Sequence, residues 1–152
     1  MLFRSSVAKA KELWDAVDRP NLMIKVPGTP EGVKAFEELI VAGIQVNVTL
    51  LFAVSAYQDV ARAYVNAIER RAKAGQTLDI ASVASFFVSR IDGVVDGLLA
   101  EKAKAETDAG RKALLESLQG KAAIANAKIA RRQFHAIFGD ADRKSIRLNS
   151  SH

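Results

Sequence analysis

Three apolar runs with strand character alternate with amphipathic helical patterns along this chain, and the alternation limits the folds open to it. The runs span residues 22–26, 44–52 and 80–88, and they are rich in Val, Ile, Leu and Phe. Apolar residues at helical spacing precede the first run, separate the runs and follow the last one. Strands and helices in this order, joined by short connections, predict a parallel α/β fold.

Local signals predict where the helices begin and end. Pro20 follows the first helical pattern and stops it, whereas Thr29 and Pro30 are the residue types expected at the N-cap and first position of the second helix. Gly43 and Gly75 are placed to end the second and third helices, because glycine readily adopts the left-handed conformation common there.

The last third of the chain predicts further helices with a polar interruption. Asp92 is placed to cap the helix that follows the third run. Residues 101–111 are polar and predict a loop or a solvated helix. Two more helices are expected after them, divided near Gly120.

Two parallel α/β architectures fit this order, a doubly wound sheet and a (β/α)8 barrel. A dinucleotide-binding doubly wound sheet would show a G-x-G-x-x-G turn after its first strand, and the sequence has none. Barrels instead carry functional side chains at the carboxyl ends of several strands, and all three runs do so here. The pattern therefore favours a barrel, to which this chain would contribute three strand–helix units.

Composition excludes several other classes of protein. The chain has 152 residues, 49% of them hydrophobic, which is enough for one domain with a core. It has no cysteine, which rules out disulfides and a cysteine nucleophile and favours the cytoplasm. With two histidines and no apolar run near about 20 residues, neither a histidine-rich metal site nor a membrane helix is expected. We therefore expect a soluble protein without a metal.

Both ends of the chain resemble sequencing adapter rather than protein. Residues 142–152 resemble the translation of a common short-read adapter with one difference, at Ile146, and residues 1–5 resemble the same adapter family read in the other direction. We expect residues 6–141 to be a native gene fragment. Leaving out the four basic residues and one acidic residue of the two ends lowers the net charge from +5 to +2. The basic character, which alone would favour a nucleic-acid-binding module, therefore comes mainly from the ends.

The first run contains a lysine, Lys25, close to its end at Pro27. A cation inside a buried strand is costly unless the chemistry uses it. If Lys25 points into a polar barrel mouth, its amine can lose its proton part of the time and attack a carbonyl carbon to form a Schiff base. The other interpretation is an ordinary strand-end lysine that extends into water.

The other two runs also carry polar residues near their ends. Asn47 and Thr49 are two residues apart and share a face, where an amide can hold a carbinolamine hydroxyl and a hydroxyl can hold a water for proton transfer. The third run, continued by one residue, places three side chains on one face, which are Ser85, Phe87 and Ser89. Arg90 follows them, and its guanidinium suits a phosphate monoester. A pair of satisfied core polar groups and a surface arginine are the alternative interpretations.

Four segments together resemble one known family. They read N-L-M-I-K-V-P-G-T, G-I-Q-V-N-V-T-L-L-F, S-V-A-S-F-F-V-S-R-I-D and G-K-A-A-I-A-N-A-K. They resemble the transaldolase family, in the bacterial branch that includes stand-alone enzymes and fusions to phosphoglucose isomerase, and the resemblance covers residues 6–141. It implies a (β/α)8 TIM barrel in which this chain supplies strands four, five and six.

The resemblance also implies a cytoplasmic transferase of the pentose phosphate pathway that uses no cofactor. It would move a dihydroxyacetone unit through a lysine Schiff base, from fructose 6-phosphate or sedoheptulose 7-phosphate to erythrose 4-phosphate or glyceraldehyde 3-phosphate. No nucleic acid or membrane is implied as a partner.

Six residues match functional positions of that family. The resemblance implies two catalytic residues, with Lys25 as the Schiff-base nucleophile and Thr49 as the holder of the water that relays protons. It also implies four substrate-binding residues, which are Asn47, Ser85, Phe87 and Arg90. Among these, Asn47 would bind the dihydroxyacetone moiety and Arg90 would be one of two phosphate-binding arginines. Ser89 stands where the best-known branch has glycine and is not expected to be catalytic.

Part of the family's site has no counterpart in this chain. The family takes an aspartate from strand one, a glutamate acid/base from strand three, and a serine and a second phosphate arginine near strand seven. We therefore expect the chain on its own to be inactive and only marginally soluble, because three strands cannot close a barrel.

Two other functions stay open at this point. A class I aldolase of the fructose 6-phosphate aldolase type shares the lysine strand and the arginine after strand six, but that branch lacks the asparagine at Asn47 and releases dihydroxyacetone free. A basic nucleic-acid-binding module is the more remote alternative, supported by charge alone.

Overall fold

A three-stranded parallel sheet lies at the centre of the protein. The computed structural model describes residues 2–139. Within them, β1 (Ile24–Pro27), β2 (Val46–Leu51) and β3 (Ser82–Phe86) pair in the order β1-β2-β3. The predicted parallel α/β arrangement is confirmed, and each strand falls within or beside one of the three apolar runs.

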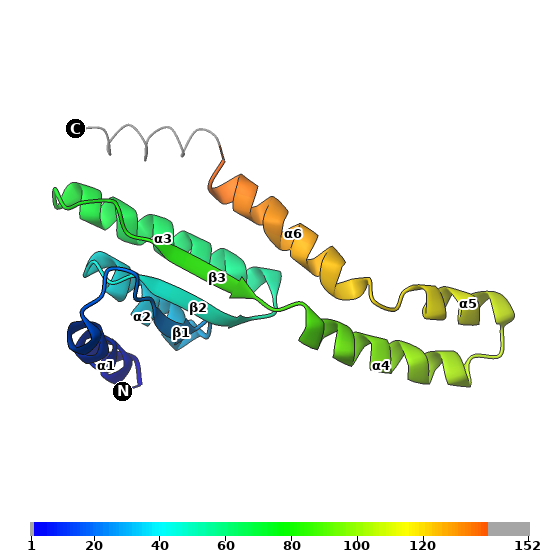
Figure 1. The fold of residues 1–152 in the computed structure, drawn as a ribbon. Coiled ribbons are helices and arrows are strands. Elements are labelled where there is room, and N and C mark those ends of the chain that lie inside the picture. The colour runs from blue at the N-terminus through cyan, green and yellow to red at the C-terminus, as the bar shows by residue number, and fades with distance from the viewer. Residues whose placement is uncertain (1, 140–152) are drawn as a thin grey trace.

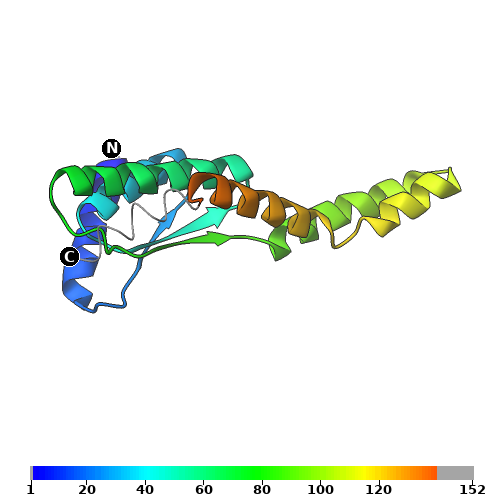
Figure 2. The ribbon, with the colours of Figure 1, turned by 90° about the horizontal axis from the view of Figure 1, so that it is seen from above.

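Helices precede the sheet and connect its strands. α1 (Leu2–Val17) comes before β1, α2 (Pro30–Val41) connects β1 to β2, and α3 (Val54–Lys73) connects β2 to β3. Figure 1 shows α2 and α3 behind the sheet, and Figure 2 shows them on the same side of it. The opposite face of the sheet is turned toward the viewer in Figure 1 and carries no helix.

The predicted signals at the ends of α2 are confirmed. The hydroxyl of Thr29 accepts a hydrogen bond from the backbone N–H of Gly32 at 3.1 Å, and Pro30 occupies the first helical position. Gly43 follows the helix with a φ of +87°, a conformation that is costly for residues with a Cβ atom.

The core lies between the sheet and its covering helices. Alternate strand residues Ile24, Val26, Val46 and Val48 are buried on the helix-covered face. They pack in one cluster with fully buried residues of α2, namely Phe36, Leu39 and Ile40. Because side chains alternate along a strand, the residues between the buried ones point to the helix-free face.

The second half of the described chain is helical. α4 (Ser89–Ala105) and α5 (Ala109–Ser117) pack against each other and project away from the sheet, and α6 (Ala122–Ile137) returns to pack on α3. Figure 2 shows this projection clearly. The predicted division between the last two helices is confirmed at Gly120, which has a φ of +69°.

One expectation for this region is wrong and a second is met in part. The helix expected to start at Asp92 begins at Ser89 instead, with Val88 at its N-cap, so Ser89 belongs to a helix and not to a strand face. The polar stretch 101–111 is neither a single loop nor a single helix. α4 runs on to Ala105, and α5 starts after Asp108, whose carboxylate accepts from the N–H of Arg111 at 2.8 Å.

The two adapter-like ends are described only in part. The tail of residues 142–152 lies outside the described residues, and α1 begins at Leu2, inside the head of residues 1–5. Among residues 2–139, no helix combines the length and the apolar character that crossing a membrane requires.

Candidate active site

The sequence-predicted residues of β1 and β2 meet on the helix-free face of the sheet. Strand pairing sets Lys25 beside Asn47 and Pro27 beside Thr49. Neighbouring strands lie about 4.8 Å apart, so side chains on the same face at paired positions are adjacent. Lys25 is exposed, Asn47 is half-buried and Thr49 is only 7% exposed. The sheet therefore presents an amine and an amide side by side in one row, with a sheltered hydroxyl two residues further along β2.

Ser85 of β3 extends this row to the third strand. Its hydroxyl donates to the Oδ1 atom of Asn47 at 2.8 Å. The bond uses one of the two acceptor sites of the Asn47 amide oxygen and fixes the plane of the amide, and the Nδ2 atom is the donor that can bind a ligand. Lys25, Asn47 and Ser85 thus lie across all three strands.

An irregularity in β2 follows directly after Thr49. The pairing of β2 with β3 shifts between Val48 and Leu51, and Leu50 has a φ of +59°. This left-handed conformation costs a residue with a Cβ atom roughly 1–2 kcal/mol. It leaves the Leu50 side chain 46% exposed while Leu51 enters the core. Such bulges re-aim side chains beside functional sites, and no residue type in β2 marks this one in advance.

A second group of residues gathers where β2 and β3 end. The N–H of Phe87 donates to the carbonyl of Leu51 at 2.8 Å. The ring of Phe87 stacks on that of Phe52, with ring centres 4.9 Å apart and planes 13° apart. The Arg90 guanidinium carbon lies 4.7 Å from the centre of the Phe87 ring, a cation–π contact. Phe87 and Arg90 therefore lie together, and Phe87 follows the strand instead of belonging to it.

Phe52 is a member of this group that sequence reasoning missed. It directly follows β2, in the position where functional side chains of barrels and parallel sheets gather. That position was the available signal, but an aromatic residue after an apolar strand reads equally well as core.

No described group of side chains suits a metal. Among residues 2–139, no three His, Cys, Asp or Glu side chains lie close enough to hold a metal ion. The chemistry that the row can support is that of an amine with neighbouring hydrogen-bonding groups, which is covalent catalysis on a carbonyl compound.

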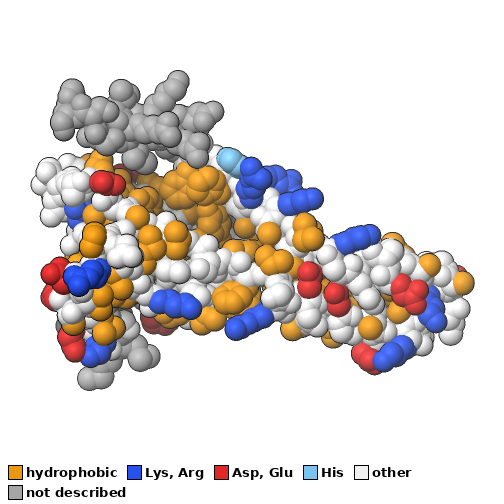
Figure 3. Space-filling view, viewed as in Figure 1, with side chains coloured by type: hydrophobic (Ala, Val, Ile, Leu, Met, Phe, Trp, Pro, Cys, Tyr) orange, Lys and Arg blue, Asp and Glu red, His pale blue; other side chains and the backbone are white. Residues whose placement is uncertain are grey.

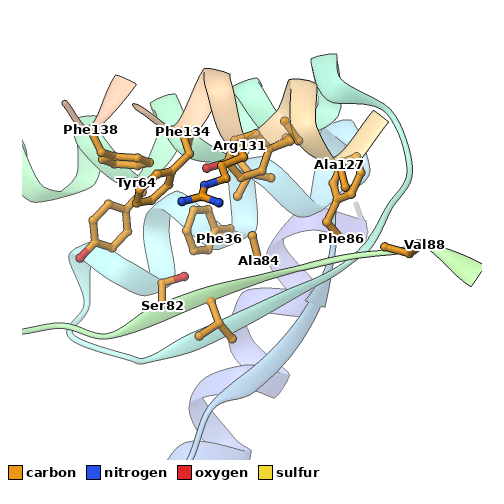
Figure 4. A pocket seen from close by; sticks show the side chains of 15 residues that line it. Phe36, Tyr64, Ser82, Ala84, Phe86, Val88, Ala127, Arg131, Phe134 and Phe138 are labelled. Atoms are coloured by element: carbon orange, nitrogen blue, oxygen red, sulfur yellow. The ribbon is translucent and has the colours of Figure 1, made fainter. Parts of the chain in front are cut away.

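A cavity of about 730 Å³ lies on the other side of the sheet, away from this row. Figure 4 shows its walls: Ser82, Ala84 and Phe86 of β3, aromatic residues of α2 and α3, Phe134 of α6, and Phe138 directly after α6. Figure 3 shows hydrophobic side chains where it opens, beside the Lys and Arg side chains of α6. None of the six predicted site residues lines this cavity.

Comparison with known proteins identifies what the chain is similar to. Residues 3–145 match the sequence profile of the family described as Transaldolase/Fructose-6-phosphate aldolase. The transaldolase of Trichodesmium erythraeum is 53% identical over 134 residues, which are 88% of this chain and 35% of that protein. The transaldolase of Parafrankia sp. is 46% identical over 134 residues, 88% of this chain and 34% of that protein. The transaldolase of Mycobacterium tuberculosis is 41% identical over 148 residues, 96% of this chain and 38% of that protein. The chain thus spans about a third of the length of these curated relatives.

Proposed function

Because the chain belongs to the transaldolase/fructose-6-phosphate aldolase family, we propose that it is a segment of a transaldolase, which transfers a dihydroxyacetone unit from a ketose phosphate to an aldose phosphate. The observation that carries this proposal is the row of Lys25, Asn47 and Ser85 across the helix-free face of the sheet. The proposal concerns the whole protein, of which this chain corresponds to about a third.

Lys25 is the nucleophile in this proposal. Its Nζ atom adds to the ketone carbon of fructose 6-phosphate, and loss of water gives an imine. A base takes the proton of the C4 hydroxyl while the bond between C3 and C4 breaks, and the protonated imine accepts the electron pair of that bond. This releases glyceraldehyde 3-phosphate and leaves an enamine of dihydroxyacetone on Lys25. The enamine then attacks the aldehyde carbon of erythrose 4-phosphate, and hydrolysis of the new imine frees sedoheptulose 7-phosphate and the lysine.

Asn47, Ser85 and Thr49 hold the groups that react. The Nδ2 atom of Asn47 donates to a hydroxyl of the dihydroxyacetone unit, because the Ser85 hydroxyl already engages its oxygen. Thr49 lies one strand away from Pro27 and is sheltered, so its hydroxyl can hold a water that carries protons between the substrate and an acid/base group. The acid/base carboxylate itself would come from another part of the barrel.

Phe87 and Arg90 form the end of the pocket that takes the phosphate. The Arg90 guanidinium lies on the Phe87 ring, a contact that limits its motion while its N–H groups stay free to bind a dianion. A second arginine from elsewhere in the whole protein would complete the phosphate site.

The helix-free face is the interior of a (β/α)8 barrel in this proposal. The three strands correspond to strands four, five and six, with the helices outside, as in every barrel of this kind. We also propose that residues 1–5 and 142–152 are not native. The whole protein would work in the cytoplasm of a bacterium and need no cofactor, and it would belong to the branch of the family that includes fusions to phosphoglucose isomerase. The family match runs from residue 3 to residue 145 and so enters both ends.

A fructose 6-phosphate aldolase is the second candidate, because the description of the matched family covers both activities. The two functions differ in what happens to the enamine on Lys25. An aldolase lets water protonate it and releases free dihydroxyacetone, whereas a transaldolase keeps it until an aldose phosphate arrives. The hydrogen bond between Ser85 and Asn47 favours the transaldolase, since it orients an amide to retain the three-carbon unit.

A chimera tests the proposed function. The 134 matched residues of the Trichodesmium erythraeum transaldolase are replaced by the corresponding residues of this chain. We expect the chimera to convert fructose 6-phosphate and erythrose 4-phosphate, and to release little free dihydroxyacetone when erythrose 4-phosphate is left out. Lys25→Arg should abolish both reactions, whereas Lys34→Arg, a matched change on α2, should not. Turnover by the Lys25→Arg chimera would contradict the proposal, and rapid release of dihydroxyacetone would establish the aldolase instead.

A further inference from the structure

The segment Gly120–Lys128 forms the turn before α6 and the first two turns of that helix, and it lies against the elements that carry Phe52 and Arg90. This is the fourth motif of the sequence, G-K-A-A-I-A-N-A-K, to which the proposed chemistry assigns no role. Three of its residues donate hydrogen bonds to α4 or to the residue after β2. The N–H of Gly120 donates to the Asp96 carboxylate at 2.9 Å, and the N–H of Ala123 donates to the Asp92 carboxylate at 2.9 Å. Asn126 makes the third contact.

Asn126 fixes the backbone from which the Phe52 ring projects. The Nδ2 atom of Asn126 donates to the carbonyl of Phe52 at 2.7 Å, across 74 positions of sequence. Phe52 lies between the end of β2 and the start of α3, where no strand partner holds its carbonyl. The same residue stacks its ring on Phe87, and Phe87 in turn contacts the guanidinium of Arg90. A continuous set of contacts thus leads from Asn126 to Arg90.

Asp92 joins α4, the helix that carries Arg90, to the start of α6. It lies two residues after Arg90 on α4, and its carboxylate accepts from Ala123 in the first turn of α6. α6 has no cap from its own N-terminal residue, so this bond satisfies one of its free N–H groups from a distance. α6 therefore contacts both the helix that carries Arg90 and Phe52, whose ring stacks on the Phe87 ring beneath Arg90.

We propose that Asn126 is a positioning residue for phosphate binding. By holding the Phe52 carbonyl, it keeps the Phe52 and Phe87 rings stacked and thereby sets the direction of the Arg90 guanidinium. The phosphate part of this inference rests on the proposed function, whereas the positioning of Arg90 does not.

Nuclear magnetic resonance of the 152-residue chain tests the positioning itself. Two signals report it, a contact between the Phe52 and Phe87 rings and the upfield shift that the Phe87 ring imposes on the Arg90 side chain. Asn126→Asp keeps the shape of the side chain but replaces the donor by an acceptor, so both signals should be lost. Asn66→Asp, the same change on the exposed face of α3, should preserve them, and Asn126→Gln should restore part of the shift.

The result that would overturn the positioning is equally direct. If both signals persist in Asn126→Asp, the contact to Phe52 does not hold the rings. If Asn126→Asp fails to fold, Asn126→Ala takes its place, and failure of both variants to fold would mean that Asn126 is only an anchor of α6, which also refutes the proposal.

A double-mutant cycle in the chimera tests the effect on phosphate. Asn126→Asp should lower kcat/KM for fructose 6-phosphate on the order of tenfold to a hundredfold, mainly through KM, because small displacements in a binding site have effects of this size. It should leave kcat/KM for unphosphorylated fructose unchanged. In an Arg90→Ala background, Asn126→Asp should have no further effect, because the two residues act through one contact.

Two outcomes would refute this arm. Effects of Asn126→Asp and Arg90→Ala that simply add would show that Asn126 does not act through Arg90, and an equal loss for fructose would show that it does not act on phosphate. A chimera that is inactive even with the native residues would refute the proposed function, while the resonance measurements would still decide whether Asn126 positions Arg90.

Discussion

Arg71 is a buried cation, and its replacement should be among the most destabilising changes in the chain. It lies on α3, is only 5% exposed and donates to three carbonyls on two other segments. Its Nη1 atom donates to Val41 at 2.7 Å and to Ile40 at 3.4 Å, and its Nε atom donates to Thr77 at 2.7 Å. Arg71 thus fastens the end of α2 and the loop before β3 to α3.

The expected loss in Arg71→Met follows from these bonds. Each short hydrogen bond from a charged donor contributes about 1.5–3 kcal/mol, and removing the guanidinium leaves the accepting carbonyls unpaired. Part of this loss is offset because the buried charge no longer has to be desolvated. We expect the free energy of unfolding to fall by about 2–4 kcal/mol. At about 2–4 °C per kcal/mol for a chain of this size, the melting temperature should fall by about 4–16 °C.

Urea unfolding followed by circular dichroism measures this loss. Arg62→Met is the matched control, because Arg62 is an exposed residue of the same helix. It should change the free energy of unfolding by no more than about 0.5 kcal/mol. If the two variants unfold at the same urea concentration, Arg71 does not fasten these segments and the reasoning from its hydrogen bonds is wrong.

Three further predictions concern packing, pH and the site. Gly32→Ala should destabilise the chain by at least about 1–3 kcal/mol in the same urea assay, because a Cβ there would lie 1.8 Å from the Pro27 carbonyl oxygen. Gly93→Ala, in the open part of α4, should instead stabilise the chain by about 0.5–1 kcal/mol. Equal effects of the two changes would contradict the close packing of Gly32 on Pro27. Burial raises the pKa of Tyr64 above its ordinary value of 10.0, so its hydroxyl loses its proton at a lower pH in the unfolded chain than in the folded chain. Tyr64 should therefore leave the stability unchanged below pH 10 and lower it above pH 10. Tyr64→Phe should lessen that fall in melting scans across alkaline pH. Ser85→Ala should lower kcat/KM of the chimera about 3- to 10-fold by freeing the amide of its partner, and an unchanged value would show that the hydrogen bond does not orient it.

The strand–helix alternation could be predicted because local residue patterns mark each strand and helix. Val, Ile and Leu runs bounded by Pro and Gly predict buried parallel strands, and Thr29 with Pro30 predicts the start of α2 whatever the rest of the chain does. The adjacency of Lys25 and Asn47 could also be predicted, because parallel pairing places side chains at the same distance along neighbouring strands beside each other.

The remaining features depend on contacts between distant segments, which local patterns do not contain. Asp92 has the residue type of an N-cap and does accept from a helix start, but the helix is α6, more than thirty positions along the chain. The alternation of residues in the sequence places Ser89 on a strand face, because no residue marks the end of β3 at Phe86. Two further contacts form only when α2, α3 and α6 are packed together. They are the hydrogen bonds from Arg71 to the carbonyls around it and the hydrogen bond from Asn126 to the Phe52 carbonyl.

The imine at Lys25 is the central claim, and trapping it is the most direct test. The chimera is incubated with fructose 6-phosphate and reduced with borohydride, and mass spectrometry of its peptides locates the adduct. The account predicts a single three-carbon adduct on Lys25, which is absent in Lys25→Arg and retained in Lys34→Arg. An adduct on Lys34 or another lysine, or no adduct in a chimera that turns over substrate, would contradict it.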